Sequence, residues 1–214
     1  MNTSAASAIV YIVDDDEDMR TSLSWLLASV KIETRSFGSV ASFFDALDLS
    51  MPSCLVVDVR MPETGGFELQ AELNRRGVSI PTIFVSGHGD IPMSVRALQN
   101  GAIDFVEKPY NSQEMLERIQ RALKIAAETH ILAQQREVLL HRIRALTPRE
   151  QQVFTGVLEG KPSKQIARDL AISAKTVDVH RASIKEKLRA TSIASLVKDV
   201  LTIQSVVGGP GLPF

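Results

Sequence analysis

Short apolar runs alternate with stretches of helical period over the first half of the chain. Five runs rich in β-branched and aromatic residues read as strands, at residues 8–13, 32–37, 54–59, 82–87 and 103–108. In the intervening stretch MRTSLSWLLASV, one helical face carries Leu23, Leu26, Leu27 and Val30. Because parallel strands need crossover helices, the alternation predicts an α/β doubly wound, five-stranded parallel sheet.

The alternation stops after residue 112 and the rest of the chain is helical in pattern. A run from Gln113 to about Arg144 contains no Pro or Gly, which predicts one long helix. Its apolar residues follow a heptad seam only roughly, so a plain connecting helix and a dimerising coil are both open. Shorter helical segments follow, and the first begins at the cap-like sequence Thr147, Pro148 and Glu150. The Gly- and Pro-rich stretch 206–214 predicts a disordered tail.

Composition describes a globular protein with two differently charged halves. The chain has 214 residues, 44% hydrophobic and 23% charged, and its single cysteine, Cys54, excludes an internal disulfide. It begins without a secretory signal and contains no apolar run of the roughly 20 residues that a membrane span needs. We therefore expect a cytoplasmic protein with no membrane partner. Residues 1–125 have a charge balance of −6 and residues 126–214 one of +5, which is compatible with nucleic acid for the second half.

Polar residues lie at the carboxyl ends of four of the predicted strands. Asp14 and Asp15 lie at the end of the first, Asp58 at that of the third, Ser86 at that of the fourth and Lys108 at that of the fifth. In an open parallel sheet, ligands bind beyond the carboxyl ends of the strands. These side chains are therefore expected to converge at one edge, whereas solvated surface charge is the preferred reading for the acidic residues 16–18.

Three carboxylates at one edge repel one another, and proteins usually offset this repulsion by binding a hard divalent cation there. Mg2+ prefers oxygen ligands and is often held by one or two carboxylates together with phosphate oxygens. A carboxylate can also attack phosphorus and form an aspartyl phosphate. We expect Asp58 to be that nucleophile, with Lys108 pairing with the transferred phosphoryl group and Ser86 donating a hydrogen bond to it.

The motifs VDDDEDMR, DVRMPETGG, VSGHGD and GAIDFVEKPY together resemble the receiver domain of two-component response regulators, over residues 7–125. The resemblance implies a flavodoxin-like fold, with Asp58 as phosphoacceptor. Mg2+ would be bound by Asp14, Asp15, Asp58 and the backbone carbonyl of Arg60. It further implies that Ser86 and Phe105 form a switch pair, that Lys108 senses the phosphate and that the Lys108–Pro109 bond is cis. For Phe105 a plain core role is the alternative. Gly65 departs from the family, since many relatives carry aspartate there.

The segment SKQIARDLAISAKTVDVHRASIKEKL contains two helical stretches separated by a short turn. Two apolar sets can pack against each other: Ile166, Ala167 and Leu170 on the first stretch, and Val177, His180, Ile184 and Leu188 on the second. This layout predicts a helix-turn-helix whose second helix enters the major groove. Structural bundles also contain such pairs, so the pattern alone leaves both readings open.

The wider segment 145–205 resembles the LuxR-type DNA-binding domain in LTPREQQV, SKQIA and KTVDVHRASIKEKL. The resemblance implies phosphate contacts from Lys164, Lys175 and Thr176. It implies base-edge contacts from Asp178, Val179, Arg181 and Ala182, with Lys185 near the DNA backbone. Asp178 departs from the many relatives with lysine; an aspartate cannot pair with guanine but could accept a hydrogen bond from cytosine.

Both resemblances together predict a transcriptional regulator of the NarL/FixJ family, with a helical linker at 126–144. The expected partners are a sensor histidine kinase, promoter DNA, RNA polymerase and, on phosphorylation, a second copy of the chain. No P-loop is present, so we do not expect the chain to bind a nucleotide as phosphoryl donor. We expect no enzyme, because the sequence offers no extended lid or evident substrate pocket. The alternatives are an aspartate-nucleophile phosphotransferase and a phosphate-gated adaptor that binds protein.

Overall fold

A computed structural model describes residues 8–87, 91–192, 194–198 and 200. The chain folds as two compact units, Met1–His130 and Ile131–Phe214, which are described separately. The division falls inside the long helix, a few residues beyond the predicted end of the first domain at residue 125. The predicted tail at 206–214 lies outside the described residues.

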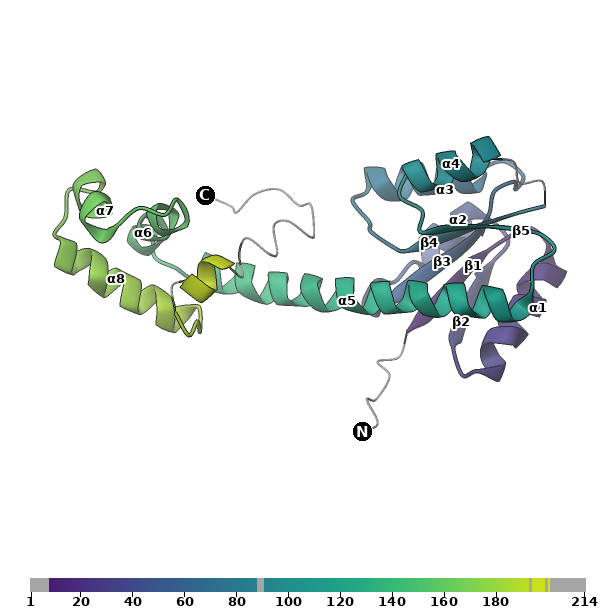
Figure 1. Cartoon of the computed structure of the whole chain (residues 1–214), viewed down its shortest axis with the longest axis horizontal. Helices are drawn as coiled ribbons and strands as arrows, with labels where there is room; N and C mark the ends of the chain where they lie inside the picture. The colour runs from purple at the N-terminus through teal and green to yellow at the C-terminus, as the bar shows by residue number, and fades with distance from the viewer. Residues whose placement is uncertain (1–7, 88–90, 193, 199, 201–214) are drawn as a thin grey trace. The chain divides into compact units, whose positions relative to one another are not determined.

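The first unit is built on a parallel sheet of five strands (Figure 1). The strands are β1 (Ile9–Val13), β2 (Glu33–Phe37), β3 (Ser53–Asp58), β4 (Thr82–Ser86) and β5 (Asp104–Glu107), in the order β2-β1-β3-β4-β5. Every neighbouring pair is parallel. The predicted fold class is therefore confirmed, and each predicted strand end lies within one residue of the observed one.

Helices cover both faces of this sheet because successive strand residues point to opposite sides. Ile9, Tyr11 and Val13 pack on the face covered by α2 (Val40–Ala46), α3 (Gly66–Arg75) and α4 (Ile91–Gln99). Val10 and Ile12 pack on the opposite face, against α1 (Glu17–Ser29) and the first part of α5 (Ser112–Arg144). Strands buried on both faces explain why their sequences read as continuous apolar runs.

The predicted apolar face of the first helix is correct only in part. Leu23 and Leu27 are buried, whereas Val30 is the C-cap residue of α1 and is 40% exposed. The helix ends before it can turn Val30 toward the sheet. Cys54 lies on β3 in the core, and burial raises the pKa of its thiol to about 12, so it acts as a small core residue.

The second unit is helical throughout its described residues. It comprises the last part of α5, then α6 (Pro148–Leu158), α7 (Ser163–Asp169) and α8 (Ala174–Lys187), and a final helical stretch over residues 194–198. One core joins these elements, and its fully buried members include Phe154, Val177 and Ile184. Among the described residues, no helix is long and apolar enough to cross a membrane.

The predicted cap at the start of α6 is confirmed as a full capping box. The Thr147 hydroxyl accepts a hydrogen bond from the Glu150 backbone N–H, and the Glu150 carboxylate accepts one from the Thr147 N–H. Glu150 is only 4% exposed and also accepts hydrogen bonds from the Ser183 hydroxyl and the Lys187 ammonium of α8, both at 2.7 Å. One carboxylate therefore ties the start of α6 to the second half of α8.

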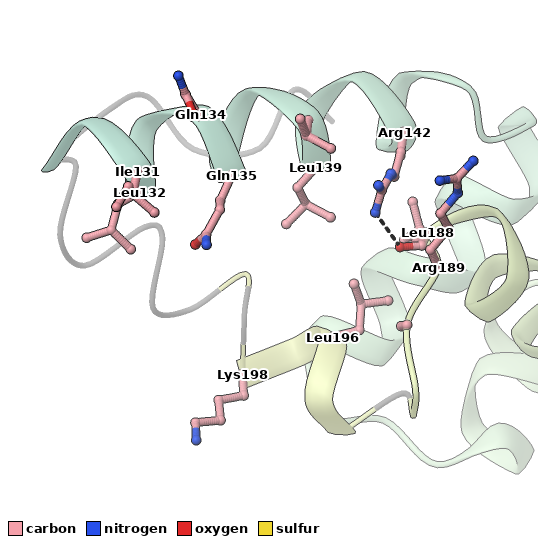
Figure 2. A pocket seen from close by; sticks show the side chains of 12 residues that line it. Ile131, Leu132, Gln134, Gln135, Leu139, Arg142, Leu188, Arg189, Leu196 and Lys198 are labelled. Carbon is pink, nitrogen blue, oxygen red and sulfur yellow. Dashed lines mark hydrogen bonds between the residues drawn. The ribbon is translucent and has the colours of Figure 1, made fainter. Parts of the chain in front are cut away.

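The last part of α5 also contacts the end of α8. Figure 2 shows the Arg142 guanidinium donating a hydrogen bond to the backbone carbonyl of Leu188, the C-cap residue of α8, over 3.3 Å. A positive side chain at this point stabilises the C-terminus of α8, because the last carbonyl groups of a helix have no partner within the helix. Beside this contact lies an open groove of about 770 Å³, with Leu139 and Leu196 among its lining residues.

Candidate functional site

The strand order brings the predicted acidic residues to one edge of the sheet. Asp14 directly follows β1, Asp58 is the last residue of β3, and Ser86 is the last residue of β4. Lys108 follows β5, and its backbone N–H donates to the Ser86 carbonyl over 2.8 Å. Since β1, β3, β4 and β5 are consecutive in the sheet, their carboxyl ends form one continuous edge.

Lys108 joins the two buried carboxylates of this edge. Its Nζ donates to Asp14 Oδ2 and to Asp58 Oδ1, each over 2.7 Å. Asp14 and Asp58 are 6% and 7% exposed. Burial alone would lower the pKa of the ammonium, but the hydrogen bonds that it donates to Asp14 and Asp58 outweigh burial and raise the pKa of Lys108. The Lys108 ammonium therefore lies between the two carboxylates and bonds to both.

The Asp14 carboxylate is desolvated by its burial. Burial disfavours its charged form and raises its pKa, although Lys108 and the backbone N–H of Asp16 act in the opposite direction. The Asp58 carboxylate is held at both oxygens, since Oδ2 accepts a hydrogen bond from the Arg60 backbone N–H over 2.6 Å. This bond and the one to Lys108 fix the orientation of the Asp58 carboxylate.

The backbone at Gly66 lies very close to the backbone of Asp58. The N-terminus of α3 packs against the end of β3, and a Cβ atom at Gly66 would lie 2.5 Å from the Asp58 carbonyl oxygen. Only glycine fits there without a shift of the backbone. Gly65, the departure from the family pattern, is the N-cap of α3 and makes no side-chain cap hydrogen bond.

The other acidic residues of the first cluster differ in their contacts, and none of those described bonds to Asp58 or Lys108. Asp15 is exposed, whereas Asp16 is the N-cap of α1 and accepts hydrogen bonds from the backbone N–H groups of Asp18 and Met19. Arg20, which the sequence did not single out, donates to the backbone carbonyls of Asp14 and Asp15 over 2.8 and 3.0 Å. It holds the loop after β1 in place.

The donor chemistry at this edge suits a hard cation. Asp14, Asp15 and Asp58 offer carboxylate oxygens and Arg60 a backbone carbonyl, which is the oxygen set that Mg2+ prefers. Within the part of the chain that the structure describes, no three His, Cys, Asp or Glu side chains already stand as a metal-binding group. Two carboxylates with waters and a phosphate oxygen form a sufficient set for Mg2+, so the residues fit the ion.

Ser86 and Phe105 lie on neighbouring strands beside the Asp58 edge. Ser86 is 1% exposed, whereas Phe105 on β5 is half-buried and packs against the core on the α2, α3 and α4 face. The Lys108–Pro109 peptide bond is cis, as the resemblance implied. The roles of Ser86 and Phe105 as a switch remain predictions.

The second candidate surface is the outward face of α8. Six of the predicted DNA-contacting residues are exposed along this helix: Lys175, Thr176, Asp178, Val179, Ala182 and Lys185. Val179 is 62% exposed, so its apolar side chain is available for contact with another molecule. Lys164 on α7 is also exposed, whereas Arg181 is half-buried. The opposite side of α8 buries Val177, Ile184 and the C-cap residue Leu188, as the packing pattern predicted, and His180 is half-buried beside them.

Three hydrogen bonds of α8 were not predicted from the sequence. The Ser163 hydroxyl at the start of α7 donates to Asp178 Oδ1 over 2.9 Å and accepts a hydrogen bond from Arg181 over 3.2 Å. Lys187 donates a hydrogen bond to Glu150. Burial would raise the pKa of Glu150, but the hydrogen bonds from Lys187, Ser183 and Thr147 outweigh burial and lower the pKa to about 2. The capping pattern singled out Glu150, but only as a helix cap.

Two protein families match the two units. The response regulator receiver domain matches residues 10–120, and the bacterial regulatory proteins of the luxR family match residues 144–199.

Individual relatives match across both units. The response regulator protein TodT of Pseudomonas putida is 42% identical over 192 residues, covering 90% of this chain and 85% of TodT. The transcriptional regulatory protein FixJ of Rhizobium meliloti is 38% identical over 197 residues, covering 90% of this chain and 94% of FixJ. The solved structure of the response regulator StyR matches 92% of this chain with a TM-score of 0.76 and 40% identity, and all of that chain is covered.

Proposed function

The chain belongs to the response regulators of the NarL/FixJ family, and from this premise we propose how its residues perform the family's function. It is a phosphorylation-dependent transcriptional regulator, whose two domains imply a histidine kinase and DNA as partners. The phosphotransferase and adaptor alternatives are not favoured. The chemistry below assigns roles to individual residues.

We propose that Asp58 accepts the phosphoryl group. One of its carboxylate oxygens attacks phosphorus, a P–O bond forms, and the bond from phosphorus to the donor's leaving group breaks. The observation that carries this assignment is the double hold on Asp58, by the Lys108 ammonium at one oxygen and the Arg60 N–H at the other. These two hydrogen bonds orient the carboxylate, and the Lys108 ammonium already lies beside Asp58, where it could pair with the oxygens of the incoming phosphoryl group.

Asp14, Asp15, Asp58 and the Arg60 carbonyl would hold Mg2+. The ion would lower the repulsion between the anionic nucleophile and the anionic donor. Asp14 is suited to this role because its burial makes the charged carboxylate costly without a cation nearby. The Lys108 ammonium offsets part of the negative charge of Asp14. Asp15, which directly follows Asp14 in the chain, is exposed to solvent.

The Ser86 hydroxyl and Phe105 would form the switch. A phosphoryl group on Asp58 adds acceptor oxygens next to β4, and a hydrogen bond from Ser86 would draw the end of β4 toward them. Phe105 would follow by turning further into the core that it already touches. Such a coupled shift would change the surface formed by α4 and β5 and favour a homodimer.

The α8 helix would read promoter DNA. Lys164, Lys175, Thr176 and Lys185 would contact the backbone, and base edges would be contacted by Asp178, Val179, Arg181 and Ala182. Two output domains paired by phosphorylated receivers would gain effective concentration on neighbouring half-sites. RNA polymerase would be the partner of the DNA-bound dimer.

The decisive test is phosphoryl transfer from acetyl phosphate to the purified full-length protein, followed by mass spectrometry. We expect one added phosphoryl group in the presence of Mg2+ and none after chelation with EDTA. Asp58→Asn keeps the shape of the side chain but removes the nucleophile, and Asp16→Asn is the matched control because Asp16 caps α1. Labelling of Asp58→Asn at the wild-type level would overturn the assignment.

A further inference from the structure

The start of α7 contacts the exposed face of α8 through one side chain. The Ser163 hydroxyl donates a hydrogen bond to Asp178 Oδ1 over 2.9 Å and accepts one from Arg181 Nη1 over 3.2 Å. A hydroxyl has one proton to donate, and here it is used on the carboxylate. Asp178 and Arg181 stand three residues apart on α8, so their side chains lie on the same face of the helix.

Ser163 is not needed to cap its own helix. The N-cap of α7 is Pro162, which makes no side-chain cap hydrogen bond, and Ser163 is the first helical residue. A capping serine occupies the N-cap position, and Ser163 lies one residue beyond it. Its hydroxyl is therefore available to the neighbouring helix, where it bonds to both Asp178 and Arg181.

We infer that Ser163 is a positioning residue for DNA sequence specificity, which sets the orientation of Asp178 and Arg181 from outside the recognition helix. This inference rests on the proposed reading of DNA by α8. Arginine pays a large entropy cost when its long side chain is fixed, and a bond that fixes it before DNA binds removes part of that cost. A half-buried Arg181 agrees with a side chain already held in one place.

The arrangement also decides which bases suit the surface. Arginine reads guanine through O6 and N7, and a carboxylate accepts a hydrogen bond from the cytosine amino group. Without a third group, opposite charges at i and i+3 on a helix attract each other directly and neutralise each other. With Ser163 between them, each side chain keeps unused hydrogen-bonding capacity for a base edge, because guanidinium has five N–H donors and carboxylate several acceptor sites.

The inference is tested by the base preference of the full-length, phosphorylated protein. A random-sequence duplex DNA library is selected with wild type, and the affinity ratio between the selected duplex and a scrambled duplex is measured for each variant. Ser163→Ala removes the bridge, and Ser163→Thr retains a hydroxyl. Gln165→Ala is the control, because Gln165 bonds to Asp169 within α7. Asp178→Ala and Arg181→Ala test the reading by α8 itself.

We expect Ser163→Ala, which removes both hydrogen bonds of the bridge, to lower the affinity ratio roughly 5- to 10-fold. Affinity for the scrambled duplex and its salt dependence should stay unchanged, since no phosphate contact is lost. Ser163→Thr and Gln165→Ala should behave as wild type.

Three outcomes would overturn the inference. The first is an unchanged ratio in Ser163→Ala together with a changed ratio in Arg181→Ala; this removes Ser163 but keeps the reading by α8. The second is an equal loss of affinity for both duplexes in Ser163→Ala and Ser163→Thr, which would show a structural role alone. The third is wild-type base preference in both Asp178→Ala and Arg181→Ala, and this outcome would also remove the proposed reading by α8.

Discussion

Replacing Glu150 by glutamine should destabilise the helix-turn-helix unit selectively. The Glu150 carboxylate is 4% exposed and receives hydrogen bonds from Thr147, Ser183 and Lys187. Glutamine has the same shape but only one acceptor oxygen, and its NH2 group would face a donor. The variant would therefore leave at least one buried group unpaired.

The pKa of Glu150 gives the size of the effect. Its value falls from 4.5 to about 2, which at 1.36 kcal/mol per unit corresponds to an upper limit of about 3 kcal/mol. Lys187 is 39% exposed, so water screens the charge pair, and we expect about 1–2 kcal/mol. Because the folded pKa lies below the unfolded one, this stabilisation is complete above about pH 5 and is lost as the pH falls toward 2.

Amide hydrogen exchange of the full-length chain, followed by mass spectrometry, would measure the two units separately. Peptides from α6 and α8 should lose about 1–2 kcal/mol of protection in Glu150→Gln at pH 7, whereas peptides from β1 and β3 should not change. In wild type the protection of α6 and α8 should decline from pH 5 to pH 3, and this decline should be smaller in the variant.

Glu159→Gln is the matched control at the other end of α6. Glu159 is exposed and pairs only with Lys161 on the surface, a pair with little net effect on stability. If Glu150→Gln cost no more than Glu159→Gln, the idea that one buried carboxylate joins α6 to α8 would have to be abandoned.

Three further predictions concern the two sites. Lys108→Ala leaves Asp14 and Asp58 without their shared cation, so in thermal melts added Mg2+ should raise the Tm of the variant more than that of wild type; an equal rise would contradict the charge argument. Ser86→Ala should still be phosphorylated on Asp58 but dimerise weakly in analytical ultracentrifugation, and unchanged dimerisation would remove Ser86 from the switch. Lys164→Ala should weaken binding to all duplexes similarly and lower the salt slope of binding by about 1, and an unchanged slope would argue against a phosphate contact.

The architecture could be predicted from sequence because it depends on local patterns. Strands buried on both faces carry continuous apolar runs, and their ends were found to within one residue. The cap at Thr147 and Glu150 was found because its spacing is fixed by the geometry of the first helical turn. The error at Val30 has a local cause as well: helical periodicity continues in the sequence after the backbone has left the helix.

The convergence of Asp14, Asp58, Ser86 and Lys108 was also predictable, because parallel strands bring their carboxyl ends to one edge. What could not be predicted is which atom contacts which. The sequence assigned Lys108 to a phosphoryl group, whereas in this structure its ammonium contacts both carboxylates. The role of Arg20 could not be predicted, because its partners are backbone carbonyls, which every residue carries.

The contacts that sequence reasoning missed share a physical property that bears on regulation. Ser163 with Asp178 and Arg181, Lys187 with Glu150, and Arg142 with the Leu188 carbonyl all join different helices through one or two polar groups. Hydrogen bonds of this kind, which involve charged but partly exposed groups, contribute about 1–2 kcal/mol each. A small free-energy change can therefore alter such contacts while the helices themselves remain folded. The orientation of α8 side chains is thus easier to adjust than the fold that carries them.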